Sequence, residues 1–430
     1  MGAMPTAPTA SLFPLRTVVL GAFLPTFLFS TGVGALLPVI APTAIDLGAS
    51  LAGAGAISAL MSVGTILTDL PAGALAARLG DRVAMVLAGV LGAGGFVLAA
   101  LAPNLVVLGA AVVVLGGAAA VFALARHSYL TEATPPLRRA RVLSTLAGVG
   151  RIGSFAGPFV GALLISRAGL GAVFVLGVTA ALAAAVTVLV VGDDDGGRAG
   201  RAATSGVTAG VTGPTADGTD RAARASVLSV LRAHAPLFRT LGLACLLIGA
   251  VRGARTTVIP LWGEHLGLDP EVTSLIFGLA GGVDMLLFYP AGKIMDRFGR
   301  NWVGIPSMLV MGVAMLALPF TGGAVSLAAA AMLLGLGNGM GSGILMTLGA
   351  DASPAHGRSQ FLGLWRTLQD TGATLGPLVV AAGAAAGSLA AGIWAAGALS
   401  PAAAGALWRW VPRWTVHANR TTRRAAGLQV

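Results

Sequence analysis

The chain has few charged residues, one cysteine and few aromatic residues. Of its 430 residues 10% are charged and 6% aromatic, and Cys245 is the single cysteine. A soluble domain carries roughly a quarter charged residues, so this composition excludes an ordinary soluble protein. One cysteine excludes a disulfide framework. The sequence also lacks a Walker phosphate loop, an HExxH zinc motif and a nucleophile triad, so we expect a non-enzymatic protein without metal or organic cofactor.

Apolar residues are in large excess. They make up 56% of the chain, and the mean hydropathy is +0.87. Runs of about 20 apolar residues are long enough to cross a hydrocarbon core of roughly 30 Å. The sequence therefore predicts an all-α membrane protein with about twelve transmembrane helices. The predicted spans lie near 15–40, 50–77, 83–102, 104–126, 142–165, 171–191, 237–263, 270–293, 302–320, 324–349, 359–384 and 387–407.

The basic residues of the predicted loops lie almost all on one side of the membrane, and only Arg167 falls on the other. By the positive-inside rule the basic side is cytoplasmic, so both termini are predicted inside a bacterial-type inner membrane. The net charge of +11 then follows from topology and predicts no nucleic-acid partner. We expect the basic C-terminal residues to contact membrane lipids beside Trp408, Trp410 and Trp414. The basic side comprises Arg16, Arg78, Arg82, Arg138, Arg139, Arg141, Lys293, Arg297, Arg300, Arg358, Arg409, Arg413, Arg420, Arg423 and Arg424.

Similar segments recur at one offset of 219 residues, because 292 − 73 = 219 and 377 − 158 = 219. Such a repeat predicts two similar halves. The matched residues are Gly73 with Gly292, Arg78 with Arg297, Gly80 with Gly299, Gly153 with Gly372, Gly157 with Gly376, and Pro158 with Pro377. We expect an N-terminal six-helix bundle over 1–191, a disordered cytoplasmic linker over 192–235, a C-terminal six-helix bundle over 236–408 and a basic cytoplasmic tail over 409–430.

Seven charged residues fall well inside the apolar spans. At roughly 2.5–3.5 kcal/mol for each charge at the membrane centre, they would together cost on the order of 20 kcal/mol if unpaired in lipid. They must therefore face one another or water, and a cavity between the two halves supplies both. The seven are Asp69, Asp284, Asp370, Arg151, Arg252, Arg255 and Arg366.

Helical spacing groups the arginines. Arg252 and Arg255 are three residues apart and share a helix face, which indicates an anion-binding surface, because guanidinium groups offer paired donors to carboxylate or phosphate. A structural role, with hydrogen bonds to helix carbonyls or phosphates, is the alternative. Arg366 and Asp370 are four apart and form either part of the substrate-binding surface or a salt bridge that only neutralises the helix. Under the 219 offset Asp370 corresponds to Arg151, so we expect these two positions to meet or to line the cavity together.

The three aspartates are candidate proton carriers. A buried carboxylate near cations can change its protonation when its access to water changes. Asp284 has no basic neighbour three or four residues away, so its partner is expected to be an arginine of another span, with Arg151 as the candidate. We rank Asp284 and Asp370 above Asp69.

Small residues line one side of the fifth predicted span. Gly153, Gly157, Pro158 and Gly161 predict close helix contact and a fixed bend. Packing alone, without any further role, also explains this pattern.

At these residues the sequence resembles the major facilitator superfamily. The segment Gly292, Asp296, Arg297, Gly299 and Arg300 is similar to the family's loop motif Gly-x-x-x-Asp-Arg-x-Gly-Arg. The usual first copy of the motif is matched by Gly73, Arg78, Gly80, Asp81 and Arg82, with Ala77 in place of the motif aspartate. The stretch from Gly153 to Gly161 resembles a span-five motif of the family's antiporter branch, especially the twelve-span proton-driven drug exporters.

The resemblance implies two pseudo-symmetric six-helix bundles and transport by alternating access. It implies a monomer that exports a small amphipathic or anionic substrate in exchange for protons, with a link to drug resistance and the proton as coupling ion. It further implies that the motif loops latch the outward-facing state on the cytoplasmic side, with Asp69 or Asp81 as substitutes for the aspartate missing at Ala77. Two alternatives stay open, namely uptake of an anionic metabolite and a lipid-handling or sensing protein.

Overall fold

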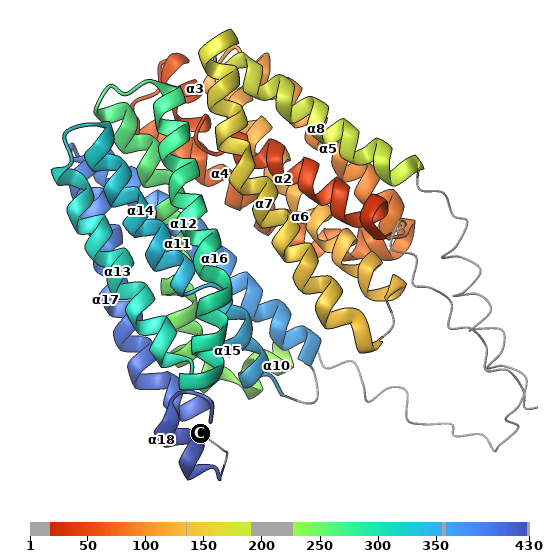
Figure 1. Ribbon diagram of the computed structural model, residues 1–430, viewed down its shortest axis with the longest axis vertical. Helices are drawn as coiled ribbons and strands as arrows, with labels where there is room; N and C mark the ends of the chain where they lie inside the picture. The colour runs from red at the N-terminus through yellow and green to blue at the C-terminus, as the bar shows by residue number, and fades with distance from the viewer. Residues whose placement is uncertain (1–17, 135, 191–226, 355–357, 428–430) are drawn as a thin grey trace, which may run out of the picture.

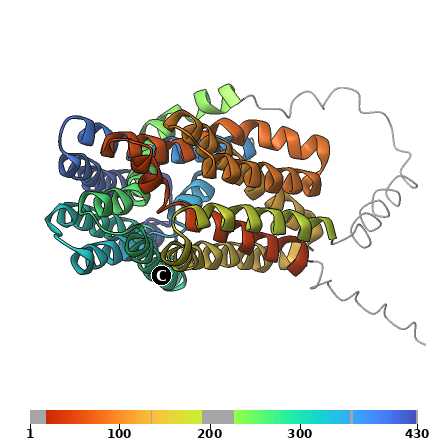
Figure 2. The same cartoon turned by 90° about the horizontal axis from the view of Figure 1, so that it is seen from above.

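The computed structural model describes residues 18–134, 136–190, 227–354 and 358–427, and these form long helices arranged in two bundles that lie side by side (Figures 1 and 2). The first bundle comes from the N-terminal half of the chain and the second from the C-terminal half. The first contains η1 (Val19–Phe23), α2 (Leu24–Leu36), α3 (Ile40–Asp46), α4 (Leu51–Leu79), α5 (Asp81–Ala100), α6 (Leu105–Ala133), α7 (Pro136–Ala168) and α8 (Gly171–Val190).

The second bundle comprises the helices from α10 onward. It contains α10 (Val227–Ala233), α11 (Ala235–His265), α12 (Pro270–Phe298), α13 (Asn301–Ala317), η2 (Leu318–Phe320), α14 (Ala324–Met340), α15 (Ile344–Ala352), α16 (Arg358–Ala385), α17 (Leu389–Trp414) and α18 (Arg420–Ala425). The last residues of the predicted linker thus form α10, and the first residues of the predicted tail extend α17. Residues 191–226, which include most of the predicted linker, lie outside the described part of the chain.

Eleven helical segments of the described chain are long and apolar enough to cross a membrane, in agreement with eleven of the twelve predicted spans. The remaining predicted span, 359–384, corresponds to α16, which has 28 residues but is less apolar because it contains Arg366, Gln369 and Asp370. α16 packs against α11 and against α4 of the first bundle. Its polar residues therefore lie where the two bundles meet.

Two spans are interrupted. The first breaks between Leu36 and Ile40, where Pro38 follows a helix that contains Gly32 and Gly34. The tenth breaks between Met340 and Ile344, and Gly343 there has a φ of +83°, a left-handed conformation that favours glycine. The prediction of one continuous span over 324–349 missed this second break.

Helix contacts repeat under the same 219 offset as the sequence motifs. A Cβ on any of six buried glycines would meet backbone atoms of the facing helix, so these helices approach as closely as glycine permits. The equivalent contacts are Gly153 to Phe27 and Gly372 to Leu246, Gly157 to Thr31 and Gly376 to Ala250, and Gly116 to Met61 and Gly335 to Ala280. The two bundles therefore share internal packing as well as motifs, which confirms the predicted pseudo-symmetry.

This packing predicts that replacing glycine by alanine affects protein stability differently at positions 376 and 405. Gly376→Ala places a methyl group against the carbonyl oxygen of Ala250 and should destabilise the protein by about 1–3 kcal/mol through overpacking. Gly405→Ala, on an exposed part of α17 with open space around it, should be neutral or stabilise by up to about 1 kcal/mol. Thermal unfolding of the detergent-purified variants measures the difference, and equal midpoints would contradict the packing argument.

The bundles touch at one end and separate toward the other. At the end that carries α3, a Cβ on Gly55 would lie 3.1 Å from Leu261 and 3.2 Å from Ala381, both of the second bundle. Toward the end that carries α15 and α18, Figure 1 shows the ribbons of the bundles diverging. We call these ends the α3 end and the α18 end.

Candidate functional site

The seven intramembrane charges gather in two clusters between the bundles. We name them the α12 cluster, made of Arg151, Arg252, Arg255, Asp284, Asn338 and Ser342, and the α16 cluster, made of Asp69, Arg366 and Asp370. Each cluster joins residues of both bundles. Every one of the seven charges has a polar partner within the protein, as their cost in lipid requires.

Asp284 is the centre of the α12 cluster. Its carboxylate lies 3.2 Å from Nη1 of Arg255 in α11 and 4.0 Å from Nη1 of Arg151 in α7, and it accepts a hydrogen bond of 2.7 Å from the Asn338 amide. The side chains of Asp284 and Arg255 are only 15% and 12% exposed. Arg151 belongs to the first bundle and the other three to the second. One carboxylate thus ties the two bundles together.

The break between α14 and α15 supplies the remaining polar partners of this cluster. Arg252 donates to the carbonyl oxygen of Gly341, and Arg151 donates to the Ser342 hydroxyl at 2.7 Å. Arg151 also lies with its guanidinium carbon 4.2 Å from the centre of the Phe288 ring. Interrupted helices expose backbone groups that can bind charge within a membrane protein. The cluster holds three arginines and one aspartate, so it carries an excess of two positive charges.

The α16 cluster has the opposite balance, two carboxylates and one guanidinium. Arg366 lies 3.5 Å from Asp370 on its own helix and 3.7 Å from Asp69 in α4 of the first bundle. Arg366 lies between the bundles, yet half of its side chain is exposed, whereas Asp69 is 24% and Asp370 17% exposed. Arg366 is therefore the most accessible of the three charges of this cluster.

The structure places the predicted residues in these clusters with some changes of partner. Asp284 has the expected arginine partner from another span, and Arg255 lies closer to it than Arg151 does. Arg151 and Asp370, related by the 219 offset, have different partners, Asp284 and Arg366 respectively. Arg366 pairs with Asp370, but it also reaches Asp69 of the other bundle, so it does more than neutralise its own helix.

Asn338 and Ser342 were absent from the predicted site. Both lie in a stretch where glycine recurs at 335, 337, 339, 341 and 343. A polar, glycine-rich interruption of a span is a signal of a ligand site between helices, so this stretch carried usable information.

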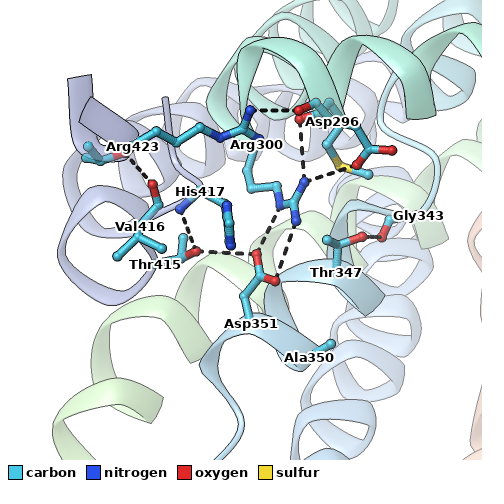
Figure 3. Close-up of polar contacts among 12 residues, drawn as sticks. Asp296, Arg300, Gly343, Thr347, Ala350, Asp351, Thr415, Val416, His417 and Arg423 are labelled. Atoms are coloured by element: carbon cyan, nitrogen blue, oxygen red, sulfur yellow. Dashed lines mark hydrogen bonds and ion pairs between the residues drawn. The ribbon is translucent and has the colours of Figure 1, made fainter. Parts of the chain in front are cut away.

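The two motif loops have the same backbone turn but different side-chain contacts. Gly80 ends α4 with a φ of +84°, and Gly299 ends α12 with a φ of +106°. After Gly299, Arg300 forms ion pairs with Asp296 at 3.5 Å and with Asp351 of α15 at 3.0 Å (Figure 3). Arg297 and Gly292 belong to the same α12 end, and the Arg297 side chain is exposed.

In the first loop Arg82 donates to the carbonyl oxygens of Val188 and Leu189 at the end of α8. Asp81 is the first residue of α5, and Arg78 is exposed in the last turn of α4, which also contains Gly73. Asp69, a proposed substitute for the missing motif aspartate, instead pairs with Arg366 of the second bundle.

The span-five residues act in helix packing. Gly153, Gly157 and Gly161 face α2, with Pro158 buried between them. Gly372, Gly376 and Pro377 form the same arrangement between α16 and α11. Because both halves share this geometry, the motif alone does not distinguish an antiporter.

The comparisons with known proteins agree with this architecture. The family model of the Major Facilitator Superfamily matches residues 22–377 and, in a second match, residues 241–426. The chain therefore belongs to the Major Facilitator Superfamily, a family of membrane transporters. No curated protein matches the sequence.

Solved structures of transporters share the fold at low sequence identity. A POT family transporter in complex with a thioalcohol-conjugated peptide is 13% identical, with a TM-score of 0.72, covering 93% of this chain and 97% of that one. A D-xylose–proton symporter is 16% identical, with a TM-score of 0.68 and coverage of 92% and 98%. A bacterial homologue of the human lysosomal transporter Spinster, inward-facing and unoccupied, is 14% identical, with a TM-score of 0.67 and coverage of 93% and 96%.

Proposed function

We propose that this protein is a secondary active transporter that exports a small amphipathic or anionic compound in exchange for protons. The observation that carries the proposal is that intramembrane carboxylates form ion pairs with arginines across the two bundles. Asp284 pairs with Arg151 and Arg255, and both Asp69 and Asp370 pair with Arg366. A change in these pairs changes how firmly the bundles are held together. This is the link that alternating access requires between binding and bundle movement.

We place the α18 end in the cytoplasm of a bacterial-type membrane, because the basic residues Arg409, Arg413, Arg420 and Arg424 gather there. The bundles then touch on the outer side and separate toward the cytoplasm, which is the inward-facing state. The Spinster homologue with the same fold is described in that state as well.

Exchange with protons fits the α16 cluster. A deprotonated Asp370 or Asp69 attracts Arg366 or a donor group on the substrate, whereas a protonated one attracts neither. Proton and substrate therefore compete for the same carboxylates. Competition of this kind produces exchange if the two ligands favour opposite orientations of the bundles.

Uptake of an anionic metabolite together with protons is the second candidate, and the charge excess of the α12 cluster favours it. A proton on Asp284 releases Arg151 and Arg255 to bind an anion, so the proton and the anion assist each other's binding. The two would then move in the same direction across the membrane.

Flux measurements in proteoliposomes separate the candidates. The compound is first identified by thermal stabilisation of the detergent-purified protein. Under an imposed pH gradient, export predicts movement of the compound against the proton flow, and uptake predicts movement with it. Asp284→Asn and Asp370→Asn should each lose gradient-driven flux, and unchanged flux in both variants would refute the assignment of these residues to proton coupling.

A further inference from the structure

The C-terminal residues after α17 fold back onto the loop between α12 and α13. We call residues Thr415–Ala426 the tail segment. The backbone amides of Arg300 and Asn301 donate to the carbonyl oxygens of His417 and Ala418, each at 3.0 Å. Ala418 is fully buried there, and a Cβ on Gly299 would lie 2.6 Å from the Ala418 carbonyl oxygen. The tail segment thus docks on the turn at Gly299, whose positive φ favours glycine.

Arg423 secures this contact. Its side chain is buried and donates to the carbonyl oxygens of Asp296, at 2.7 Å, and Arg297, at 3.3 Å, at the C-terminus of α12. Free carbonyls at a helix C-terminus attract a cation, so this position suits an arginine. Asn419 starts α18 with reciprocal hydrogen bonds to Thr422, which holds Arg423 in place.

Asp351 joins the tail segment to α15. Its carboxylate accepts hydrogen bonds from Nε of Arg300 at 3.0 Å and from the Thr415 hydroxyl at 3.3 Å (Figure 3). The side chain is 16% exposed. Asp351 is the penultimate residue of α15, so the α18 end of this helix is held by the loop and the tail together.

The opposite end of α15 adjoins the α12 cluster. Ser342 and Gly341, which bind Arg151 and Arg252, immediately precede this helix. At 1.5 Å per residue the nine residues of α15 span about 14 Å. Gly343, in its left-handed conformation, lies between these residues and the first turn of α15. Because α15 is short, the contacts that hold Asp351 at one end also fix the position of the first turn at the other end.

From these contacts we infer that the tail segment is a positioning element for the α12 cluster, acting through Asp351 and α15. Thr415 and Arg423 are positioning residues in this arrangement, since neither touches the cluster. Their loss allows α15 to pivot at Gly343 and loosens the partners of Arg151 and Arg252. The relevance of this effect to transport rests on the proposed function, but the positioning itself does not.

Hydrogen–deuterium exchange of the full-length protein, without ligand or pH gradient, tests the inference. Arg423→Ala loses the bonds to Asp296 and Arg297, and Thr415→Val loses the bonds to Asp351 and from the His417 amide. Because a hydrogen bond that involves a charged group is lost in each, both variants should raise amide exchange across residues 341–352 by roughly tenfold. The matched control is Arg424→Ala, which removes the same charge one residue along from an exposed side chain. It should leave exchange at residues 341–352 unchanged.

Conservative replacement distinguishes positioning from general damage. Thr415→Ser keeps the hydroxyl that reaches Asp351 and should retain wild-type exchange, whereas the nearly isosteric Thr415→Val should not. If Thr415→Val and Arg423→Ala raise exchange only within residues 415–426, the inference is overturned. Since the measurement uses no flux, its failure is distinct from a failure of the transport proposal.

Discussion

A disulfide between the two bundles at the α3 end should abolish transport, and reduction should restore it. The variant carries Gly55→Cys and Ala381→Cys in a Cys245→Ala background. A Cβ at position 55 lies 3.2 Å from that of Ala381, close to the Cβ separation of about 3.5–4.5 Å found in disulfides. Because α4 and α16 belong to different bundles, the bond prevents the separation of the α3 ends that alternating access requires.

The control for this experiment is a disulfide within one bundle. A Cβ at position 161 in α7 would lie 3.4 Å from the Cβ of Ala35 in α2. Ala35→Cys with Gly161→Cys links two helices that move together, so oxidation should leave flux unchanged. Full flux through the oxidised Gly55→Cys and Ala381→Cys protein would show that the α3 ends need not separate.

Removal of the Asp284 carboxylate should be among the most damaging single changes in the protein. Asp284→Ala leaves Arg255, Arg151 and Arg252 without their shared counter-charge in a largely buried place. Loss of one partner of a buried ion pair costs about 3–5 kcal/mol. We therefore expect a lower midpoint of thermal unfolding, with a smaller loss in Asp284→Asn, whose amide oxygen still accepts a hydrogen bond from Arg255.

A double variant and a surface control complete the test. Asp284→Ala with Arg255→Ala should be more stable than Asp284→Ala alone, because it removes one of the orphaned charges. Asp269→Ala, at the exposed start of the same helix where the side chain makes no capping bond, should cost less than about 1 kcal/mol. A double variant no more stable than Asp284→Ala would contradict the charge argument.

The clusters illustrate how far spacing along the chain predicts contacts. The cost of charge in lipid correctly required partners for Asp284 and Arg366, and helix spacing identified Asp370 as one of them. The sequence also offered Arg151 as a partner of Asp284 from another span, whereas the pair from Asp69 to Arg366 joins the two bundles and was determined only by their docking. Asn338 was missed because an amide in a span carries no charge penalty large enough to demand a partner.

The amino-acid sequence by itself determined the membrane class, the duplication and the identity of the buried charges, because these depend on local hydropathy, repeat spacing and the cost of ionised groups in hydrocarbon. The break before α15, the division of the charges into a positive and a negative cluster, and the docking of the tail segment were decided by the tertiary structure. They depend on which helix faces meet, and the energy of a contact between distant segments exists only once those segments are packed together.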